Sequence, residues 1–107
     1  MYAVIFEVQH KTELATEDYF DLAAELRPEL EAIDGFISVE RFSSLSDKGK
    51  FLSISFWRDE EALKQWREHY QHRQAQQKGR GEIFNDYRIR VAKVIRDYGM
   101  TNRKEAP

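Results

Sequence analysis

The order of elements in this sequence predicts an α+β domain of the ferredoxin-like βαββαβ type, in which a four-stranded antiparallel sheet carries two helices on one face. Three observations point to this fold. Apolar residues alternate along four separate segments, as they do in strands. Two stretches with apolar residues at helical spacing separate the first strand from the second and the third from the fourth. A turn rich in Asp and Gly lies between the second and third strands, which predicts a hairpin.

The first strand and the first helix occupy the N-terminal third of the chain. Residues 2–10 alternate with apolar side chains on both faces, so this strand is expected to be central in its sheet. Thr16 is a suitable N-cap for the helix that follows, and Gly35 ends that helix because glycine adopts positive φ at low cost. Pro28 should kink this helix or divide it after Leu26, since proline lacks a backbone N–H donor.

The middle of the chain predicts a hairpin that runs directly into a second helix. A strand from Phe36 to about Ser44 is followed by a turn within residues 46–49, and the strand that begins at Phe51 pairs with it in antiparallel fashion. At Asp59 the period changes from that of a strand to that of a helix. Asp59 is a good N-cap, and the two glutamates after it place negative charge on the first helical turn.

The C-terminal part completes the sheet. Glycines around residues 79–81 interrupt the second helix, and a fourth strand is expected over residues 87–95. The alternation of that strand slips near residues 92–95, which suggests a bulge. We therefore expect a single domain over residues 1–98 and a flexible C-terminal tail over residues 99–107.

Composition excludes several functional classes. The chain has 107 residues and a net charge of −2, with 17 basic and 19 acidic residues mixed along it, so a partner held by counterion release, such as nucleic acid or an anionic membrane, is not expected. The absence of cysteine excludes disulfides and thiolate chemistry. The apolar run at the N-terminus is too short to span a bilayer, and a cytoplasmic location is the default expectation.

The second face of the predicted sheet carries large apolar residues from several strands. A sheet with helices on one side leaves this face without cover, and an apolar surface of that size predicts a partner. The simplest partner is a second copy of the chain, so we expect a homodimer formed through the sheet face.

Titratable and aromatic side chains converge on the second helix. Helical spacing places Trp66, His69, His72 and Arg73 on one side of it. Trp66 either packs in the core or forms the wall of an aromatic pocket. The histidines are either solvated or functional, and His72 is the candidate general base because a neutral imidazole can take a phenolic proton near pH 7. No third ligand accompanies the two histidines, so a metal site is not expected.

Charged residues on the strands add further candidates. Glu7 lies on an otherwise apolar strand, where an unpaired carboxylate is costly, so it should pair with Arg88 or Arg90 or face a polar pocket. Arg73 and Arg88 are ion-pair partners or solvated residues. In a functional role they would hold a developing oxyanion.

The residues from strand three into the second helix resemble the antibiotic biosynthesis monooxygenase family of dimeric α/β barrels. The resemblance extends over Tyr2 to Tyr98 and also includes the Asp34-Gly35-Phe36 junction. The segments that carry it are Phe56-Trp57, Asp59-Glu60-Glu61, Ala62-Leu63 and Trp66, followed by His69 and His72 before Gly79.

The resemblance implies a homodimer whose two sheets face each other, with a pocket between sheet and helices in each subunit. It also implies two kinds of activity: cofactor-independent oxygenation of quinols and polycyclic aromatic ketones, and haem degradation. The haem-degrading branch uses an Asn on strand one together with a Trp and a His on the second long helix. Trp66 matches that Trp and His72 is the nearer candidate for the His, but this chain has Phe6 and Glu7 where the Asn would stand.

These considerations lead to the expectation of a monooxygenase that needs no cofactor. A small electron-rich aromatic such as a hydroquinone would enter a pocket lined by Phe6, Phe56, Trp66 and Tyr70. His72 would take a proton, and the resulting anion would react with dioxygen without metal or flavin.

Three alternatives remain at this point. The first is a ligand-binding or stress-responsive dimer of the same fold without catalysis. The second is a haem-binding protein with His72 or His69 as axial ligand. The third, an RNA-binding domain, ranks last because the segment FLSISFW carries no Lys or Arg between its aromatic residues.

Overall fold

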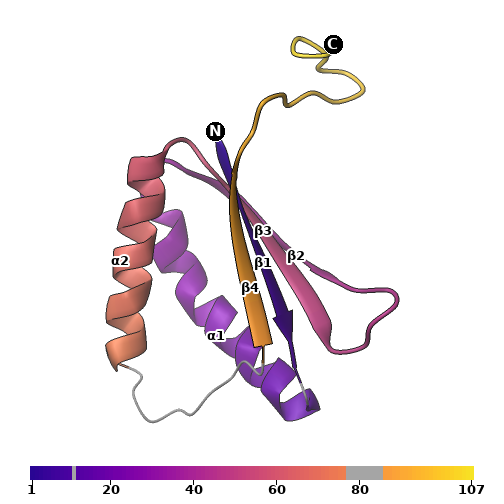
Figure 1. The fold of residues 1–107 in the computed structure, drawn as a ribbon. Coiled ribbons are helices and arrows are strands. Elements are labelled where there is room, and N and C mark those ends of the chain that lie inside the picture. The colour runs from indigo at the N-terminus through magenta and orange to yellow at the C-terminus, as the bar shows by residue number, and fades with distance from the viewer. Residues whose placement is uncertain (11, 77–85) are drawn as a thin grey trace.

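The predicted fold is confirmed: the chain forms a four-stranded antiparallel sheet with two helices on one face (Figure 1). The structure, a computed structural model, describes residues 1–10, 12–76 and 86–107, of which residues 13–16, 71–76 and 86 are described through their backbone alone. The elements are β1 (Tyr2–Gln9), α1 (Glu13–Glu31), β2 (Phe36–Ser43), β3 (Lys50–Trp57), α2 (Glu60–Gln76) and β4 (Asp86–Lys93).

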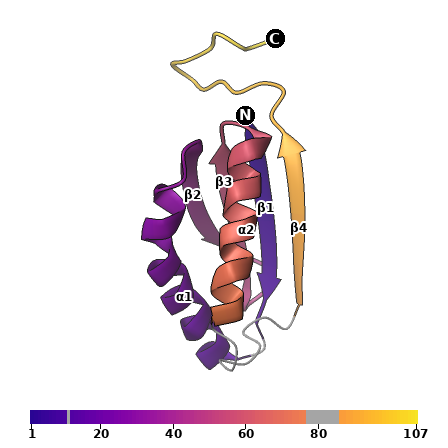
Figure 2. The same ribbon diagram turned by 90° about the vertical axis from the view of Figure 1, so that its left-hand side faces the viewer.

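The strand order in the sheet is β2-β3-β1-β4, so β1 is central as its sequence predicts. It pairs along its whole length with β3, from Tyr2 opposite Trp57 to Gln9 opposite Lys50. Both helices lie on the same side of the sheet, and neither of them stands in front of the outer strand β4 (Figure 2). None of the described elements covers the opposite face of the sheet (Figure 1).

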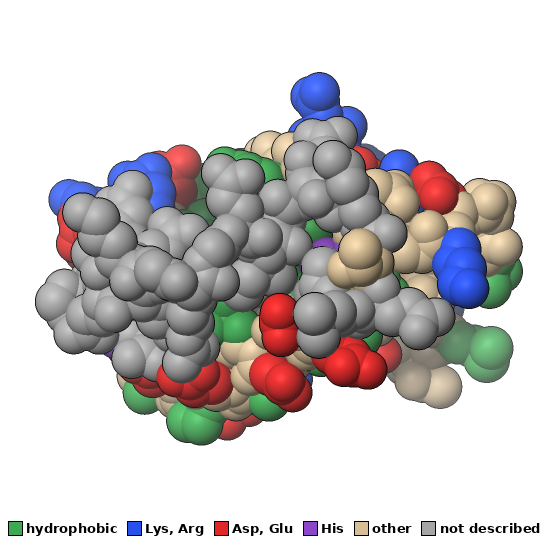
Figure 3. All heavy atoms as spheres, turned by 90° about the horizontal axis from the view of Figure 1, so that it is seen from below, with side chains coloured by type: hydrophobic (Ala, Val, Ile, Leu, Met, Phe, Trp, Pro, Cys, Tyr) green, Lys and Arg blue, Asp and Glu red, His purple; other side chains and the backbone are tan. Residues whose placement is uncertain are grey.

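The core lies between β3 and the helix ends near the α1–β2 junction. Trp57 is fully buried and packs with the buried residues Leu30, Val39 and Ala62. Partly buried apolar residues surround this cluster: Val4, Ile33, Phe36, Leu63 and Trp66. Below it, Figure 3 shows the end of the molecule where α1 begins, with acidic and hydrophobic side chains visible between the residues that are not described.

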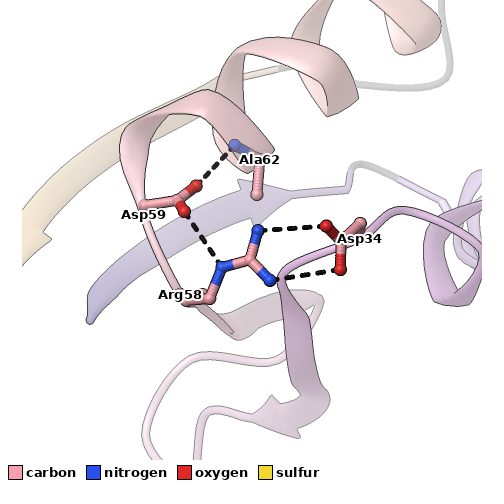
Figure 4. A network of polar contacts seen from close by, with 4 residues as sticks. All are labelled: Asp34, Arg58, Asp59 and Ala62. Atoms are coloured by element: carbon pink, nitrogen blue, oxygen red, sulfur yellow. Dashed lines mark hydrogen bonds and ion pairs between the residues drawn. The ribbon is translucent and has the colours of Figure 1, made fainter.

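One arginine joins the end of β3 to the α1–β2 junction (Figure 4). The Arg58 guanidinium donates to both carboxylate oxygens of Asp34, at 3.1 and 3.2 Å, and its Nε donates to Asp59 at 3.0 Å. Asp59 also accepts a hydrogen bond of 2.9 Å from the backbone N–H of Ala62, which confirms it as the N-cap of α2. The neighbouring Gly35 has a φ of 98°, and a Cβ there would lie 2.7 Å from the Cβ of Ala62, so only glycine fits.

Helix α1 differs from its sequence prediction in two respects. It begins at Glu13 rather than after Thr16, and Thr12, the residue immediately before it, is also of a type favoured at that position. It also continues through Pro28 without division, as the hydrogen bond of 3.2 Å from Ala32 N–H to the Pro28 carbonyl shows. Pro28 is exposed, so water can satisfy the carbonyl that it leaves without an N–H partner.

The predicted bulge in the last strand is wrong. Strand β4 pairs with β1 in unbroken register from Asp86 opposite Gln9 to Lys93 opposite Tyr2. The alternation of apolar residues gives the impression of a slip because Val91 and Ala92 are consecutive, both apolar, and point to opposite faces of the sheet. The register shift in the sheet lies instead in β2, between Phe36 and Ser38.

Candidate functional site

A pocket of about 180 Å³ lies between the sheet and the two helices. The sheet contributes its floor through Val4, Phe6, Val39, Arg41, Ser53, Ser55 and Ile89. Helix α1 contributes one wall through Tyr19, Leu22, Ala23, Leu26, Arg27 and Leu30, and helix α2 contributes another through Trp66 and Tyr70. An apolar cavity of about 150 Å³ is large enough to bind benzene. The pocket therefore suits a single ring with short substituents.

Strand pairing divides the floor into a polar half and an apolar half. Along one row of Cα partners, Arg41 lies opposite Ser53, Ser53 opposite Phe6, and Phe6 opposite Ile89. In the neighbouring row Ser55 takes the place of Ser53, with Val39 and Val4 on either side. Strands β2 and β3 contribute Arg41, Ser53 and Ser55 beside the apolar Val39, whereas the described lining residues of β1 and β4 are all apolar. A bound molecule therefore meets a different environment at each end.

Arg41 is the cationic group in the polar half of the floor. Its Nε atom is buried and has no hydrogen-bond partner among the residues that the structure describes. Its guanidinium carbon lies 5.9 Å from the centre of the Tyr19 ring, a cation–π contact that supplies no acceptor oxygen. Arg27 also lines the pocket, but its Nε is bound to Glu31 at 2.7 Å.

The aromatic wall of the pocket is held by the core. The Trp66 ring stacks on buried Trp57, with ring centres 6.4 Å apart and planes at 26°, and contacts Tyr70 at 5.9 Å. Trp57 is itself held by a hydrogen bond of 2.9 Å from its Nε1 to the Oγ of Ser55. Trp66 and Tyr70 therefore form a rigid aromatic wall that rests on the core.

His69 lies behind this wall rather than on the pocket surface. Its ring stacks on Trp66 with centres 5.9 Å apart, and its Nε2 lies 3.2 Å from Oε1 of Glu29 on α1. The pair connects the two helices. His69 can therefore influence a bound molecule through the position of Trp66, but it does not touch the space that such a molecule would fill.

The structure brings together part of the site expected from the sequence. Phe6, Trp66 and Tyr70 line the pocket. The side chains of His72 and Arg73, in the last turns of α2, lie outside the described residues.

Three predicted residues, Glu7, Phe56 and Arg88, are not part of the pocket lining and belong to the opposite face of the sheet. The expectation that Phe56 lines the pocket is therefore corrected. The reason is the strict alternation of β3: Trp57 and Ser55 point toward the helices, so Phe56 between them points away. Glu7 forms an ion pair of 3.1 Å with Arg90, one of the two partners considered for it.

Sequence reasoning missed Arg41 and Tyr19 as pocket residues. Arg41 could have been found in the same way as Glu7, because it is a charged residue on a strand. It lies two residues after the apolar Val39, so the two side chains share one face of the strand. Tyr19 carries no comparable signal, because an aromatic residue on an amphipathic helix is as consistent with a core position.

The described residues of the pocket offer neither the space nor the ligands that haem requires. A pocket of about 180 Å³ lacks room for a porphyrin, and no histidine is among the described residues that line it. The pocket as described therefore does not fit haem. No group of three His, Asp or Glu side chains suited to a metal ion occurs within residues 1–10, 12–76 and 86–107. None of the helices in this part of the chain is long and apolar enough to cross a membrane.

Comparison with solved structures supports the fold. Rv0793 from Mycobacterium tuberculosis superimposes with a TM-score of 0.74 at 21% identity, over 92% of this chain and 98% of that one. The haem-degrader MhuD from the same organism, with two haems bound in its active site, gives a TM-score of 0.65 at 15% identity, over 91% of this chain and 99% of that one. Likeness at such identities concerns the fold alone.

Comparison of sequences identifies closer relatives. The jasmonate monooxygenase ABM of Pyricularia oryzae is 48% identical over 94 residues, which is 88% of this chain and 43% of that protein. The uncharacterized protein YqjZ of Bacillus subtilis is 37% identical over 62 residues, which is 58% of this chain and 53% of that protein. The chain thus spans about half the length of these relatives. The family model described as antibiotic biosynthesis monooxygenase matches residues 1–78. The chain belongs to the antibiotic biosynthesis monooxygenase family.

Proposed function

We propose that this chain carries the active site of a monooxygenase that oxidises a small electron-rich ring compound, such as a hydroquinone, without metal or flavin. The observation that supports this most directly is the apolar pocket of about 180 Å³, which has an aromatic wall and the dimensions of one ring. The name of its relative in Pyricularia oryzae, a monooxygenase, agrees with this activity. Family membership alone does not define the substrate.

The proposed reaction needs only a base and a dry pocket. His72, on the same helix as Trp66 and Tyr70, would take the phenolic proton of the bound hydroquinone. The resulting anion is electron-rich and reacts with dioxygen directly. The substrate supplies all the electrons: one oxygen atom enters the ring, the other leaves as water, and the product is a hydroxyquinone. Trp66, Tyr70 and Phe6 would exclude water and hold the ring during these steps.

His69 would act as a positioning residue in this scheme. Its contacts with Trp66 and Glu29 fix the aromatic wall from behind, so its effect on the substrate is indirect. His72 remains the proposed catalytic residue. Arg73 and Arg88 are not needed for the proposed proton transfer.

The partner that we propose is a second copy of this chain. The sheet face away from the helices carries Ile5, Leu52, Ile54 and Phe56, of which Ile5 and Ile54 are direct Cα partners. Phe42 on the same face is 48% exposed. An apolar sheet face without a covering layer is the kind of surface that homodimers bury.

Oxygen consumption with methylhydroquinone tests the catalytic proposal. We expect saturable uptake above the rate of autoxidation, and a fall in kcat/KM of at least about tenfold, or about 1.4 kcal/mol, in His72→Ala. Glu68→Ala, at an exposed position of the same helix, is the matched control and should keep the wild-type rate. Uptake that equals the buffer rate, or that is the same in wild type and His72→Ala, would refute the role of His72 and favour a ligand-binding protein without catalysis.

A further inference from the structure

Arg41 is a charged group that the proposed reaction leaves without a task. It lines the pocket, yet its Nε is buried with no hydrogen-bond partner among the described residues. The ion pairs found in the described part of the chain engage other arginines: Arg27 with Glu31, Arg58 with Asp34 and Asp59, and Arg90 with Glu7. A guanidinium is always charged near neutral pH, and burying any part of it without an acceptor is unfavourable.

The described residues around Arg41 do not provide an anion that pairs with it. None of the described residues that line the pocket is a carboxylate. Tyr19 offers its ring face to the guanidinium at 5.9 Å, which stabilises the positive charge but accepts no conventional hydrogen bond. Ser53, directly across from Arg41 on the neighbouring strand, adds a hydroxyl that can donate to an anion at the same place.

Away from Arg41, Ser53 and Ser55 the floor of the pocket is apolar. Phe6, Val4 and Ile89 complete the floor, and Trp66 stands over it from α2. A molecule that fills this space thus meets one cationic end and one hydrophobic end. Such a pocket favours an anionic ligand, because hydrogen bonds from a guanidinium to an anion are stronger than those to a neutral acceptor.

We propose that the pocket binds a small apolar carboxylic acid as its anion, with the carboxylate on Arg41 and Ser53 and the hydrocarbon part between Phe6 and Trp66. A carboxylate matches the two-pronged donor geometry of a guanidinium better than a single phenolate oxygen does. The inference rests on the proposed function in that it names the class of compound for the same pocket. Binding nevertheless can be measured without turnover.

The test compares two ligands of equal size that differ in charge, 3-phenylpropionate and 3-phenylpropionamide, by isothermal titration calorimetry at pH 7. We expect wild type to bind the acid at least about tenfold more tightly than the amide, a difference of about 1.4 kcal/mol. Arg41→Met should abolish this preference and retain binding of the amide. Arg67→Met removes an exposed arginine of α2 that is not part of the described pocket lining, and should leave the preference unchanged.

Several results would overturn the proposal. They are equal affinities of wild type for acid and amide, no binding of either compound, or a preference for the acid that persists in Arg41→Met. If circular dichroism shows that Arg41→Met does not fold, Arg41→Gln replaces it with the same expectation, and the wild-type comparison stands independently.

The affinities, taken together with the oxygen-uptake assay, separate this inference from the proposed function. Selective binding of the acid by a protein that consumes no oxygen would leave Arg41 as the anion site and remove catalysis. Oxygen consumption with equal affinity for acid and amide would support catalysis and remove the carboxylate site. Arg41 would then act on an oxyanion formed during the reaction.

Discussion

Trp57 shows how single residues serve both the core and the pocket. Its ring has no exposed surface, and it packs on Phe36 at 5.4 Å on one side and on Trp66 at 6.4 Å on the other. Its Nε1 donates to Ser55, so the one polar atom of the ring is satisfied within the fold. Because Trp66 rests on this buried ring, the position of the pocket wall is determined by the core rather than by a loop.

Asp34 and Arg58 form a two-pronged ion pair at the surface, with N···O distances of 3.1 and 3.2 Å. Hydrogen bonds from Arg58, followed by its positive charge, hold the pKa of the Asp34 carboxyl below its usual range. The pKa of Asp59 is lowered as well, first by the backbone N–H of Ala62 and then by Arg58. Both carboxylates therefore favour the folded state while they are ionised.

The lowered pKa of Asp34 predicts a pH-dependent contribution to stability. A carboxyl with a depressed pKa in the folded state stabilises fully above the unfolded value of about 3.9, and this contribution is lost as the pH falls from there through the folded value. The Tm of Asp34→Asn should therefore fall less than the Tm of wild type when the pH is lowered from roughly 5 to 2. Thermal melts followed by circular dichroism measure this difference.

The matched control is the same substitution in an Arg58→Gln background. Since Arg58 is the main cause of the shift, Asp34→Asn should then change the acid dependence little. Identical pH profiles for wild type and Asp34→Asn would contradict the account.

At the residue level the sequence predicts side chains whose environment follows from periodicity. Trp66 and Tyr70 recur at helical spacing and Phe6 alternates along a strand, and all three line the pocket. The assignment of Phe56 was wrong because alternation defines two faces without saying which one meets the helices. Arg41 was missed because its unusual burial depends on which helix covers β2, a tertiary relationship.

At the scale of elements, helix α2 links the core to the pocket. Asp59 caps its first turn, Ala62 lies in the core, and Trp66 and Tyr70 one and two turns later reach the pocket. The contact of 3.2 Å between His69 and Glu29 then ties the helix to α1. Movement of α2 would therefore change the shape of the pocket and the packing of Trp57 together.

The elements that could be predicted best are those with strong local signals. The Asp59 cap, the hairpin turn ending at Gly49 with a φ of 85°, and Gly35 after α1 all follow from the residue types at these positions. Predictions failed where solvent exposure or contacts with neighbouring elements determine the local structure. Pro28 is tolerated because its face of α1 is exposed, and the apparent slip in β4 reflects apolar residues on both faces rather than a bulge.

At the scale of the whole molecule, the sheet separates two apolar regions with different partners. One face meets the helices and contributes to the pocket, while the other carries Ile54 and its neighbours and is not covered by any element that the structure describes (Figure 1). The proposed homodimer would bury this second face. The pocket and the dimer interface would then lie on opposite sides of the same strands.

The proposed dimer predicts a specific sensitivity to charge on the open face. Ile54→Asp would place a carboxylate near the centre of the apolar surface, where burial without a partner costs several kcal/mol, so the protein should become monomeric. Ala24→Asp, at an exposed position of α1, should leave the dimer intact. Light scattering coupled to size exclusion measures the mass, and circular dichroism checks that each variant is folded. A monomeric wild type, or a dimeric Ile54→Asp, would contradict the proposal.

If the pocket catalyses oxygen insertion, the fate of the two oxygen atoms of dioxygen will show it. Methylhydroquinone is incubated with the protein under ¹⁸O₂, and the products are analysed by mass spectrometry. The account predicts a hydroxyquinone with a single ¹⁸O atom, the second atom appearing in water, and a rate that depends on His72. Formation of unlabelled quinone with hydrogen peroxide, at a rate that the protein does not change, would contradict it.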